Sequence, residues 1–356
     1  MRKLFFICEW AFLKRKTWSG TCWHIKRALR KYFKIKNIPL STKFSIFLRK
    51  IIKNNNNYTL KANGINNRKL EKIDTDEKIF QFTDVKRGHN TFTYVDLVAP
   101  FILELYEKNK EIFYVSGFKN HTYEVLKYRS QDFWDYLDSG GKVLTMSKWL
   151  CDWIKQKNDK YIDNVFYIGA GYNCSVIKKE LNKSRNKLLY IGRDYIRKDL
   201  LLVIESYKSA KEVLPELELF VAGVNPKYLD ANYKGNGITY VGECNEKKIS
   251  KLYKVCDIFI MPSKFEAFGI VFIEALANGL PCIGRNSYEM PNFIENGKTG
   301  LLLENEDSEE LSEKILQILR SDEYFKNVIA RHDYYVKEYS WDTVALRINN
   351  IINRKN

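Results

Sequence analysis

Two glutamates, Glu266 and Glu274, are separated by seven residues in the segment KFEAFGIVFIEALANG. Glu266 falls in the expected loop after an apolar strand, and Glu274 in the second turn of the helix that follows. Such a helix directs free backbone amides toward the crevice where phosphates bind. Glu274 would accept hydrogen bonds from a diol such as ribose, and Glu266 would bind sugar hydroxyls or stabilise positive charge at an anomeric carbon. The alternative, a solvent-facing Glu274, is weakened by its apolar neighbours.

Two cations, Arg193 and Lys198, lie in the segment IGRDYIRKD after another apolar strand. Ligands bind at the carboxyl edge of parallel sheets, so both cations are placed to meet one. Two cations there suit a diphosphate, whose negative charge grows as it leaves. Either cation alone would be read as a surface charge. Two glutamates expected at the same edge favour a binding site.

These four residues require a parallel sheet whose strands end at one edge. From about Lys187 onward, short apolar runs alternate with helical patterns. The expected strands are KLLYIG, LELFVAG, ITYVG, DIFIMPS, LPCIG and TGLLLE, and the expected helices include DLLLVIESYKSAKEVL, residues 245–256, GIVFIEALAN and a helix opened by Asp307 with Glu310 at capping-box spacing. Wholly apolar strands alternating with helices predict a Rossmann-like domain with a buried parallel sheet.

The N-terminal half follows the same alternation less regularly. LFFICEW predicts a strand, TWSGT a glycine loop, and CWHIKRALRKYF a helix with one apolar and one basic face. The apolar face would hold Ile25, Ala28, Leu29, Tyr32 and Phe33, and the basic face Lys26, Arg27, Arg30, Lys31 and Lys34. A second basic amphipathic segment, STKFSIFLRKIIK, follows, and IFQFTD, TFTYVD, KVLTMS and VFYIG read as strands. We therefore expect domains at residues 1–170 and 171–338, with residues 339–356 as a helix packing back toward the first.

Length and composition exclude several classes of protein. Because 45% of its residues are hydrophobic, the chain is not intrinsically disordered. Its 356 residues are enough for two domains, each with a hydrophobic core. No apolar run is long enough to span a bilayer. The net charge is +16, and residues 1–60 alone carry fifteen Lys or Arg against one acid. That concentration predicts an anionic partner for the N-terminal segment.

Metal and disulfide chemistry find no support in the pattern of residues. The four histidines show no ligand spacing, and Asp74 and Asp76 lie in a charged stretch that reads as a solvated turn. We expect no metal and no cofactor beyond a co-substrate. The seven cysteines are scattered and odd in number, which favours a reducing cytoplasm as the compartment.

Taken together, these motifs resemble the family 4 retaining glycosyltransferases of the GT-B fold. The resemblance rests on GRDYIRKD, the strand pair LELFVAG and ITYVG, the segment LYKVCDIFIMPSKFEAFGIVFIEALANGLPCIG and ENGKTGLLL. It is strong from about residue 187 to 303, and weaker in VLTMSKWL, VFYIGAGYN and TWSGT. It implies an α/β GT-B architecture, in which two Rossmann-like domains with parallel sheets face each other across a cleft.

The resemblance also implies roles for individual residues. Arg193 and Lys198 match the cations that bind the donor diphosphate, Glu266 the glutamate near the transferred sugar, and Glu274 the one on the nucleotide ribose. The family turn that approaches sugar hydroxyls and phosphate corresponds to Phe268, Gly269 and Ile270, and the N-terminal glycine loop that faces the donor corresponds to Gly20.

Two positions depart from the family pattern. Many members have glycine after the lysine, where this chain has Asp199, so the local turn is expected to differ. Many also have a histidine at the end of the strand read as TFTYVD, where this chain has Asp96. If that alignment holds, an acid replaces the usual group near the anomeric centre, and Asp96 joins Glu266 as a candidate catalytic residue.

The implied activity is metal-independent transfer of a hexose-like sugar from a nucleotide-diphosphate sugar to a hydroxyl of a glycan or lipid-linked acceptor, with retention, in surface polysaccharide or glycolipid biosynthesis. The N-terminal domain would take the acceptor, and residues 1–60 would contact an anionic membrane, which places the protein in the cytoplasm or on the inner face of the cell membrane. The alternatives are a basic nucleic-acid-binding protein, which has no use for paired glutamates at a phosphate-binding edge, and a catalytically inactive GT-B scaffold. Nucleotide, sugar and acceptor stay open.

Overall fold

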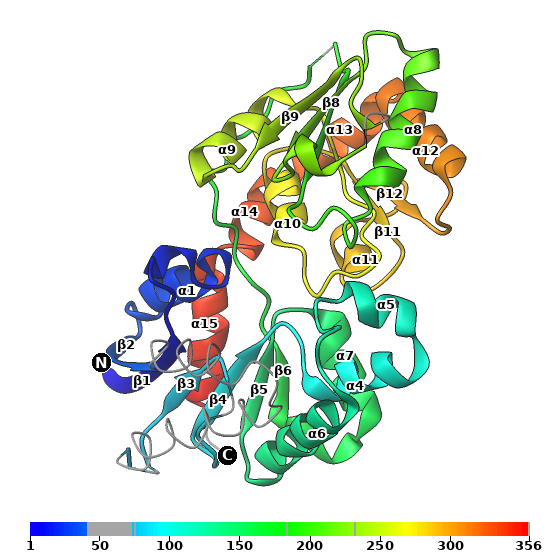
Figure 1. The fold of residues 1–356 in the computed structure, drawn as a ribbon. Helices are drawn as coiled ribbons and strands as arrows, with labels where there is room; N and C mark the ends of the chain where they lie inside the picture. The colour runs from blue at the N-terminus through cyan, green and yellow to red at the C-terminus, as the bar shows by residue number, and fades with distance from the viewer. Residues whose placement is uncertain (41–72, 75, 84, 183, 231–232, 355–356) are drawn as a thin grey trace. The chain divides into compact units, whose positions relative to one another are not determined.

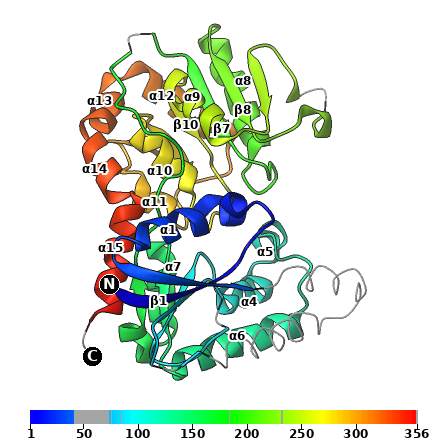
Figure 2. The ribbon, with the colours of Figure 1, turned by 90° about the vertical axis from the view of Figure 1, so that its left-hand side faces the viewer.

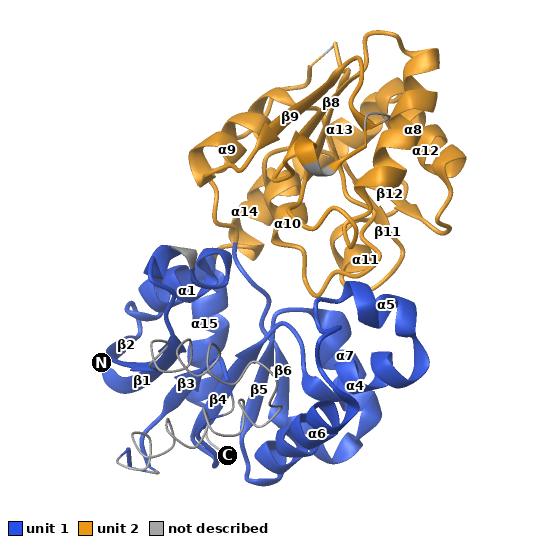
Figure 3. Cartoon of the chain, in the orientation of Figure 1, with its two compact units in different colours: residues 1–171, 341–356 blue, residues 172–340 orange. Residues whose placement is uncertain are grey.

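The chain folds into two compact units (Figure 3). The computed structural model describes residues 1–40, 73–74, 76–83, 85–182, 184–230 and 233–354. Unit 1 comprises residues 1–171 and 341–356, and unit 2 comprises residues 172–340. The chain therefore leaves unit 1, completes unit 2 and returns to unit 1 for its last helix. The expected boundaries were 170/171 and 338/339.

Unit 1 is built on a six-stranded sheet in the order β2-β1-β3-β4-β5-β6 (Figure 1). Every neighbouring pair runs parallel. The strands are β1 (Arg2–Glu9), β2 (Phe33–Leu40), β3 (Ile79–Gln81), β4 (Thr91–Val95), β5 (Lys142–Thr145) and β6 (Val165–Tyr167). Five consecutive residues of β1, from Leu4 to Cys8, are buried. This is the pattern expected of a parallel strand that is covered on both faces.

The described helices of unit 1 connect its strands, except the last one, which follows unit 2 in the chain. They are η1 (Lys14–Gly20), α1 (Thr21–Leu29), α4 (Ala99–Lys108), α5 (Lys110–Val115), α6 (Tyr123–Asp138), α7 (Lys148–Lys157), η2 (Asp159–Asn164) and the C-terminal α15 (Trp341–Ile352). Helix α15 packs beside α1, as Figure 2 shows. The two elements are held in part by the stacked rings of His24 and Trp341, whose centroids are 6.3 Å apart.

The prediction of a helix through residue 33 is wrong beyond Leu29. The chain turns at residues 30–32 and then forms β2, which pairs with β1 over eight residues from Arg2↔Phe33 to Glu9↔Leu40. Pairing with a buried strand outweighs the helical period of this short stretch. Lys34 therefore lies on an edge strand and not on the helix. The apolar face is confirmed for Ile25, Ala28 and Leu29, which are buried.

The predicted basic face is also altered at Lys26. Its ammonium donates a hydrogen bond to Asn37 at 2.7 Å and lies over the rings of Phe6 and Trp10. Burial lowers its pKa, and Arg30 and Lys14 add to the effect. The side chain therefore packs against the sheet. The second predicted basic segment, residues 41–53, lies outside the described residues.

Unit 2 has a second parallel sheet of six strands in the order β12-β11-β10-β7-β8-β9. The strands are β7 (Lys187–Ile191), β8 (Glu218–Ala222), β9 (Ile238–Gly242), β10 (Ile258–Ile260), β11 (Cys282–Arg285) and β12 (Gly300–Leu303). All six were predicted, five of them with ends within two residues, whereas β10 ends three residues before the predicted strand 257–263 does. Strands β7 and β10 lie at the centre, so the loops that follow them meet at one edge.

The described helices of unit 2 include the four that were predicted, in the predicted order, and four that were not. They are α8 (Leu200–Val213), η3 (Pro226–Tyr228), α9 (Glu246–Val255), α10 (Ile270–Ala277), α11 (Met290–Phe293), α12 (Ser308–Arg320), α13 (Asp322–Ala330) and α14 (His332–Glu338). Asp307 caps α12 by accepting a hydrogen bond from the Glu309 amide at 2.9 Å. The Glu310 carboxylate accepts hydrogen bonds from the Glu304 and Asn305 amides instead of that of Asp307, so the capping box is only half formed.

Two further expectations concern thiols and membrane spans. All seven cysteines lie in the described part of the chain and are free, and six of them are buried. Among the described residues, none of the helices combines the length and apolarity that crossing a bilayer requires.

Candidate functional site

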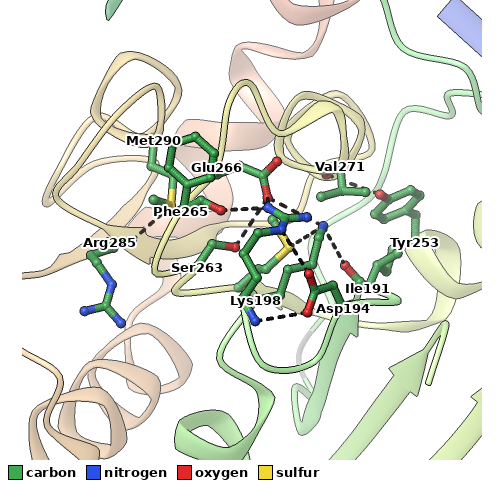
Figure 4. Close-up of polar contacts among 12 residues, drawn as sticks. Ile191, Asp194, Lys198, Tyr253, Ser263, Phe265, Glu266, Val271, Arg285 and Met290 are labelled. Atoms are coloured by element: carbon green, nitrogen blue, oxygen red, sulfur yellow. Dashed lines mark hydrogen bonds and ion pairs between the residues drawn. The ribbon is translucent and has the colours of Figure 1, made fainter. Parts of the chain in front are cut away.

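The carboxylate of Glu266 lies buried at the carboxyl edge of the unit 2 sheet, among groups from two loops (Figure 4). Its Oε2 atom is 3.2 Å from Arg197 Nη1, 3.6 Å from Lys198 Nζ and 3.4 Å from the Ser263 hydroxyl, which donates to it. Burial acts to raise the pKa of Glu266, but Lys198 and Arg197 outweigh it and hold the pKa below its ordinary value. Glu266 is therefore a charged acceptor near neutral pH.

Lys198 brings an ammonium group to the same place, and all of its polar contacts are long or weak. Besides Glu266, its Nζ contacts the Ile191 carbonyl oxygen at 3.4 Å and the Met261 sulfur at 3.1 Å. Gly192 makes this packing possible, because a Cβ there would lie 2.4 Å from Lys198 Cδ. Burial lowers the pKa of Lys198, and Glu266 opposes that shift. An ammonium with only long contacts can bind an anion without breaking a strong hydrogen bond.

Arg197, which the sequence did not single out, positions Glu266. Its Nη1 donates to the Phe265 carbonyl at 2.7 Å as well as to Glu266, and its Nε lies 3.5 Å from Asp194. The Lys264 amide donates to the Arg197 carbonyl at 2.9 Å. These contacts join the loop after β7 to the loop after β10. Arg197 therefore fixes the two halves of the site to each other.

A glycine turn leads from Glu266 into α10. Gly269 has φ 92°, and a Cβ there would lie 2.9 Å from the Phe272 ring and 3.2 Å from Glu266 Cγ. Only glycine fits this left-handed, crowded position without strain. Phe268 is buried against Phe293, with ring centroids 5.0 Å apart, and Ile270 begins the helix. The free amides at the start of α10 therefore lie next to Glu266, where the helix dipole favours an anion.

Glu274 lies one turn further along α10 in a separate buried environment. Its Oε1 accepts a hydrogen bond from the Asn173 amide at 2.9 Å, and its Oε2 accepts one from the Tyr253 hydroxyl at 3.2 Å. Burial raises the pKa of Glu274 to about 7, although both hydrogen bonds oppose the rise. The alternative of a solvent-facing Glu274 is wrong, because the residue is only 6% exposed.

The raised pKa of Glu274 predicts a pH-dependent contribution to stability. Between pH 4.5 and 7 the folded protein keeps a proton that the unfolded chain has lost, so the contribution of this group falls as pH rises through that window. The loss is on the order of 3 kcal/mol. Glu274→Gln removes the titration. Urea unfolding at pH 4.5 and pH 8 measures the free energy of unfolding of both proteins. The value for wild type minus the value for the variant should be smaller at pH 8 than at pH 4.5. A difference that does not depend on pH would contradict this pKa.

Arg193 and Tyr190 complete the edge with groups that have no partner among the described residues. Arg193 is exposed just after β7 and makes no ion pair with any described residue. The buried hydroxyl of Tyr190 makes no hydrogen bond with the described part of the chain. It lies close to the Gly192 backbone, at 2.9 Å from the position of a Cβ there. Tyr190 read as a strand residue in the sequence, and no pattern marked it.

Asp199 adopts the glycine-like turn where the resembling family has glycine. Its φ is 54° and its ψ 49°, which is the left-handed region that ordinary residues avoid. Its carboxylate is 2.8 Å from Arg285 Nη2, and Arg285 Nη1 is in turn 2.8 Å from Glu306. Burial raises the pKa of Asp199, and Lys264 and Arg285 oppose the rise. Arg285 therefore holds a strained turn directly after Lys198.

This pair predicts a rescue experiment. Arg285→Ala leaves the buried Asp199 carboxylate without its closest cation and should lower the free energy of unfolding by about 3 kcal/mol. Adding Asp199→Gly removes both the isolated charge and the left-handed strain, so the double variant should regain about 1 to 2 kcal/mol. Chemical denaturation of the four proteins measures the coupling. Simple additivity of the two substitutions would show that Arg285 does not support this turn.

The two remaining predicted residues, Gly20 and Asp96, lie in unit 1 at the carboxyl edge of its sheet. Trp18, Ser19 and Gly20 have consecutive positive φ values of 48°, 50° and 96°, and Gly20 caps α1. Successive amides in such a turn, followed by a helix, form a concavity that suits anions. Asp96 follows β4 directly. It acts electrostatically on Cys22, whose pKa is raised by burial, by Cys8 and by Asp96. Asp96 therefore lies near the start of α1.

The structure thus gathers the predicted residues into groups. Lys198, Glu266 and the turn at 268–270 form one cluster, Glu274 lies one helical turn away, and Arg193 is on the loop of Lys198. Gly20 and Asp96 both belong to unit 1. In the described part of the chain, no three His, Cys, Asp or Glu side chains are arranged to hold a metal ion.

Residues 175–335 match the family described as glycosyl transferases group 1. A sulfoquinovosyl transferase of Arabidopsis thaliana is 27% identical over 46% of this chain and 32% of its own length. An O-antigen chain mannosyltransferase of Escherichia coli is 22% identical over 65% of each chain. The chain thus spans about a third to two thirds of the length of these relatives.

Solved structures match over the whole chain. WaaG, a glycosyltransferase involved in lipopolysaccharide biosynthesis, has a TM-score of 0.68 at 15% identity and covers 99% of this chain and 100% of its own. HepE of Anabaena, solved with UDP and glucose, has a TM-score of 0.67 at 13% identity, with both chains fully covered. The fold is therefore GT-B, as expected.

Proposed function

We propose that this chain is a glycosyltransferase that takes a hexose-like sugar from a nucleotide-diphosphate sugar held by unit 2. The observation that carries the proposal is the meeting of Lys198, the free amides of α10 and the charged Glu266 at one sheet edge, inside the region that matches glycosyl transferases group 1. The neighbouring structure of HepE was solved with UDP and glucose.

Each group has a role in the proposed reaction. Lys198, Arg193 and the amides at the start of α10 stabilise the charge that develops on the leaving diphosphate. Glu274 accepts hydrogen bonds from the ribose diol, and Glu266 binds hydroxyls of the transferred sugar. Because fixed cations and amides neutralise the diphosphate, the proposed transfer does not require a metal ion.

Unit 1 supplies the acceptor side in this proposal. In it, the backbone at Gly20 binds the donor, and the Asp96 carboxylate stabilises positive charge at the anomeric carbon in the transition state. Transfer with retention follows from the resemblance to retaining enzymes. The acceptor is a hydroxyl of a glycan or lipid-linked molecule, in surface polysaccharide or glycolipid synthesis.

The donor is identified by a thermal-shift screen against UDP-, GDP- and ADP-sugars, followed by a hydrolysis assay without acceptor. A ligand that binds only the folded state raises the melting temperature, by an amount that grows with its concentration relative to Kd. The proposal expects one base to stand out. No shift with any nucleotide sugar, together with a salt-dependent gel shift of nucleic acid, would favour the nucleic-acid-binding alternative.

The exposed basic residues of unit 1 support a further part of the proposal, contact with an anionic membrane. Lys14, Arg15, Arg27, Lys34 and Lys36 are exposed. In the turn after β1, two exposed apolar side chains directly precede Lys14 and Arg15 in the sequence: Phe12 is fully exposed and Leu13 is 54% exposed. Each cation near an anionic leaflet contributes about 1 kcal/mol. The described part of this surface is a turn, a short helix and an edge strand, and the second expected basic segment, residues 41–53, lies outside the described residues.

Sedimentation with liposomes tests this contact. Wild type should sediment with vesicles containing anionic phospholipid at low salt and be released at high salt, because exposed charges are screened. Replacing Phe12 and Leu13 by serine should reduce the bound fraction several-fold. Tyr114→Ser, which changes an exposed aromatic of α5, is the matched control. No binding of wild type at low salt would remove the membrane from the proposal.

A further inference from the structure

A groove of about 490 Å³ lies in unit 1 where α4, α6 and α7 meet. These helices lie together in Figure 1, and none of the site residues named above lines the groove. Its volume is within the range of small-molecule sites, ~300–1,000 Å³. The groove is therefore large enough to bind a small molecule, separately from the site in unit 2.

Aromatic rings from three elements line this groove, which we call the α4–α6–α7 groove. Trp134 comes from α6, Trp153 from α7 and Tyr161 from η2. Trp134 stacks on Tyr161 at 5.5 Å with an interplanar angle of 18°, and Trp153 meets the ring of Phe101 edge-on at 5.3 Å. Both indoles are thus held by neighbouring rings while remaining partly exposed to the groove.

Several polar groups of the groove have unused hydrogen-bonding capacity. Ser130 is only 8% exposed, and its hydroxyl makes no hydrogen bond with a described residue. The indole N–H groups of Trp134 and Trp153 likewise have no acceptor within the described ranges. Glu107 is exposed and makes no ion pair there. These groups can therefore form hydrogen bonds with a ligand or with water in the groove.

The charge of the groove differs from that of the chain as a whole. Its lining contains three acids, Glu104, Glu107 and Asp138, and one cation, Lys157. Glu104 pairs with both Lys157 and Lys108, and Asp138 pairs with Lys160 and accepts a hydrogen bond from the Tyr161 hydroxyl at 2.9 Å. Glu107 is the acid of this lining that makes no ion pair with a described residue. It therefore disfavours phosphate, sulfate and uronate groups.

We propose that the α4–α6–α7 groove binds a neutral segment of an oligosaccharide. A pyranose ring presents one face of C–H groups, which would pack on Trp134 or Trp153, and a rim of hydroxyls, which would meet Ser130, Glu107 and the indole N–H groups. An oligosaccharide without charge avoids the repulsion that the acids impose on an anion. The inference rests on the proposed function in one respect, that the bound segment belongs to a glycan acceptor.

The test is direct binding of sugar to the full chain with no nucleotide present. Tryptophan fluorescence and calorimetry would follow titration with neutral oligosaccharides derived from mannan, dextran and chitin, and with an oligogalacturonate as the anionic counterpart. Wild type should bind at least one neutral series and bind the uronate series at least tenfold more weakly. Trp134→Ala and Trp153→Ala should each weaken binding tenfold or more, whereas Tyr128→Ala, an exposed aromatic of α6 outside the groove, should not change it.

Glu107→Lys keeps the test decisive if a tryptophan variant fails to fold, because this exposed residue makes no ion pair with a described residue and its replacement places a cation in the groove. It should also weaken binding tenfold. Glu274→Ala should bind the sugar as wild type does, which separates this inference from the donor site. The inference is overturned if wild type binds none of the neutral series, if it prefers the uronate, or if the groove variants bind unchanged.

Discussion

Arg193→Ala is expected to lower kcat/KM for the nucleotide-sugar donor by about 10²- to 10³-fold, the usual effect of removing one group that stabilises developing negative charge. Arg193 is exposed and makes no ion pair with a described residue, so its loss breaks no contact of the described structure. The melting temperature should therefore stay within a degree or two of wild type. Steady-state kinetics with saturating acceptor, together with scanning calorimetry, measures both quantities.

The matched control for this change is Lys247→Ala. Lys247 is an exposed cation of the same unit, on α9, and has no role in the proposed site. Its replacement alters net charge equally and should leave kcat/KM unchanged. Near-normal activity of Arg193→Ala, or equal losses in both variants, would remove Arg193 from the diphosphate site.

Glu274→Ala is expected to weaken nucleotide binding about 100-fold or more, because two hydrogen bonds to the ribose diol are lost at a buried position. The melting-temperature rise caused by the donor or by the free nucleoside diphosphate should disappear at concentrations that saturate wild type. A diol donates its hydrogen bonds more strongly to an ionised carboxylate than to a protonated one. The affinity of wild type for the nucleotide should therefore fall as pH drops below about 7, the pKa of Glu274 in the protein without ligand. Calorimetric titration at pH 6 and pH 8 measures this dependence.

Two comparisons separate binding from folding. Glu274→Gln keeps an acceptor for the Asn173 amide, and its side-chain amide can donate to the oxygen of the Tyr253 hydroxyl, so it should fold normally and still bind nucleotide poorly, without the pH dependence. Glu313→Ala, which removes an exposed acid of α12, should bind as wild type does. Tight nucleotide binding by Glu274→Ala would place the ribose elsewhere.

The order of elements in unit 2 could be predicted because each strand is a short apolar run and each helix has clear end signals. The loop positions of Glu266 and Lys198 followed from that order alone, since loops after parallel strands meet at one sheet edge. In unit 1 the same reasoning failed at residues 30–40. There a basic stretch with helical period forms β2, because pairing with the buried β1 decides its conformation.

Contacts between loops could not be predicted from spacing. Arg197 adjoins Lys198 in the chain and looks like a second surface cation until the loop after β10 brings Phe265 and Glu266 to it. Arg285 lies 86 residues from Asp199, and their ion pair supports a left-handed turn that the family fills with glycine. The α4–α6–α7 groove depends on three helices whose packing no local pattern specifies. These contacts join residues that are far apart in the sequence, so they form only in the folded unit and cannot be read from local spacing.

In the proposed function, unit 2 binds a nucleoside diphosphate through Lys198, Arg193 and Glu274. Isothermal titration of wild type and of Arg193→Ala with the nucleoside diphosphate chosen by the thermal-shift screen tests it most directly. Wild type should bind the nucleoside diphosphate at one site per chain, and the variant should bind it at least tenfold more weakly. Equal affinity of the two proteins, or no binding of UDP, GDP or ADP to wild type, would contradict it.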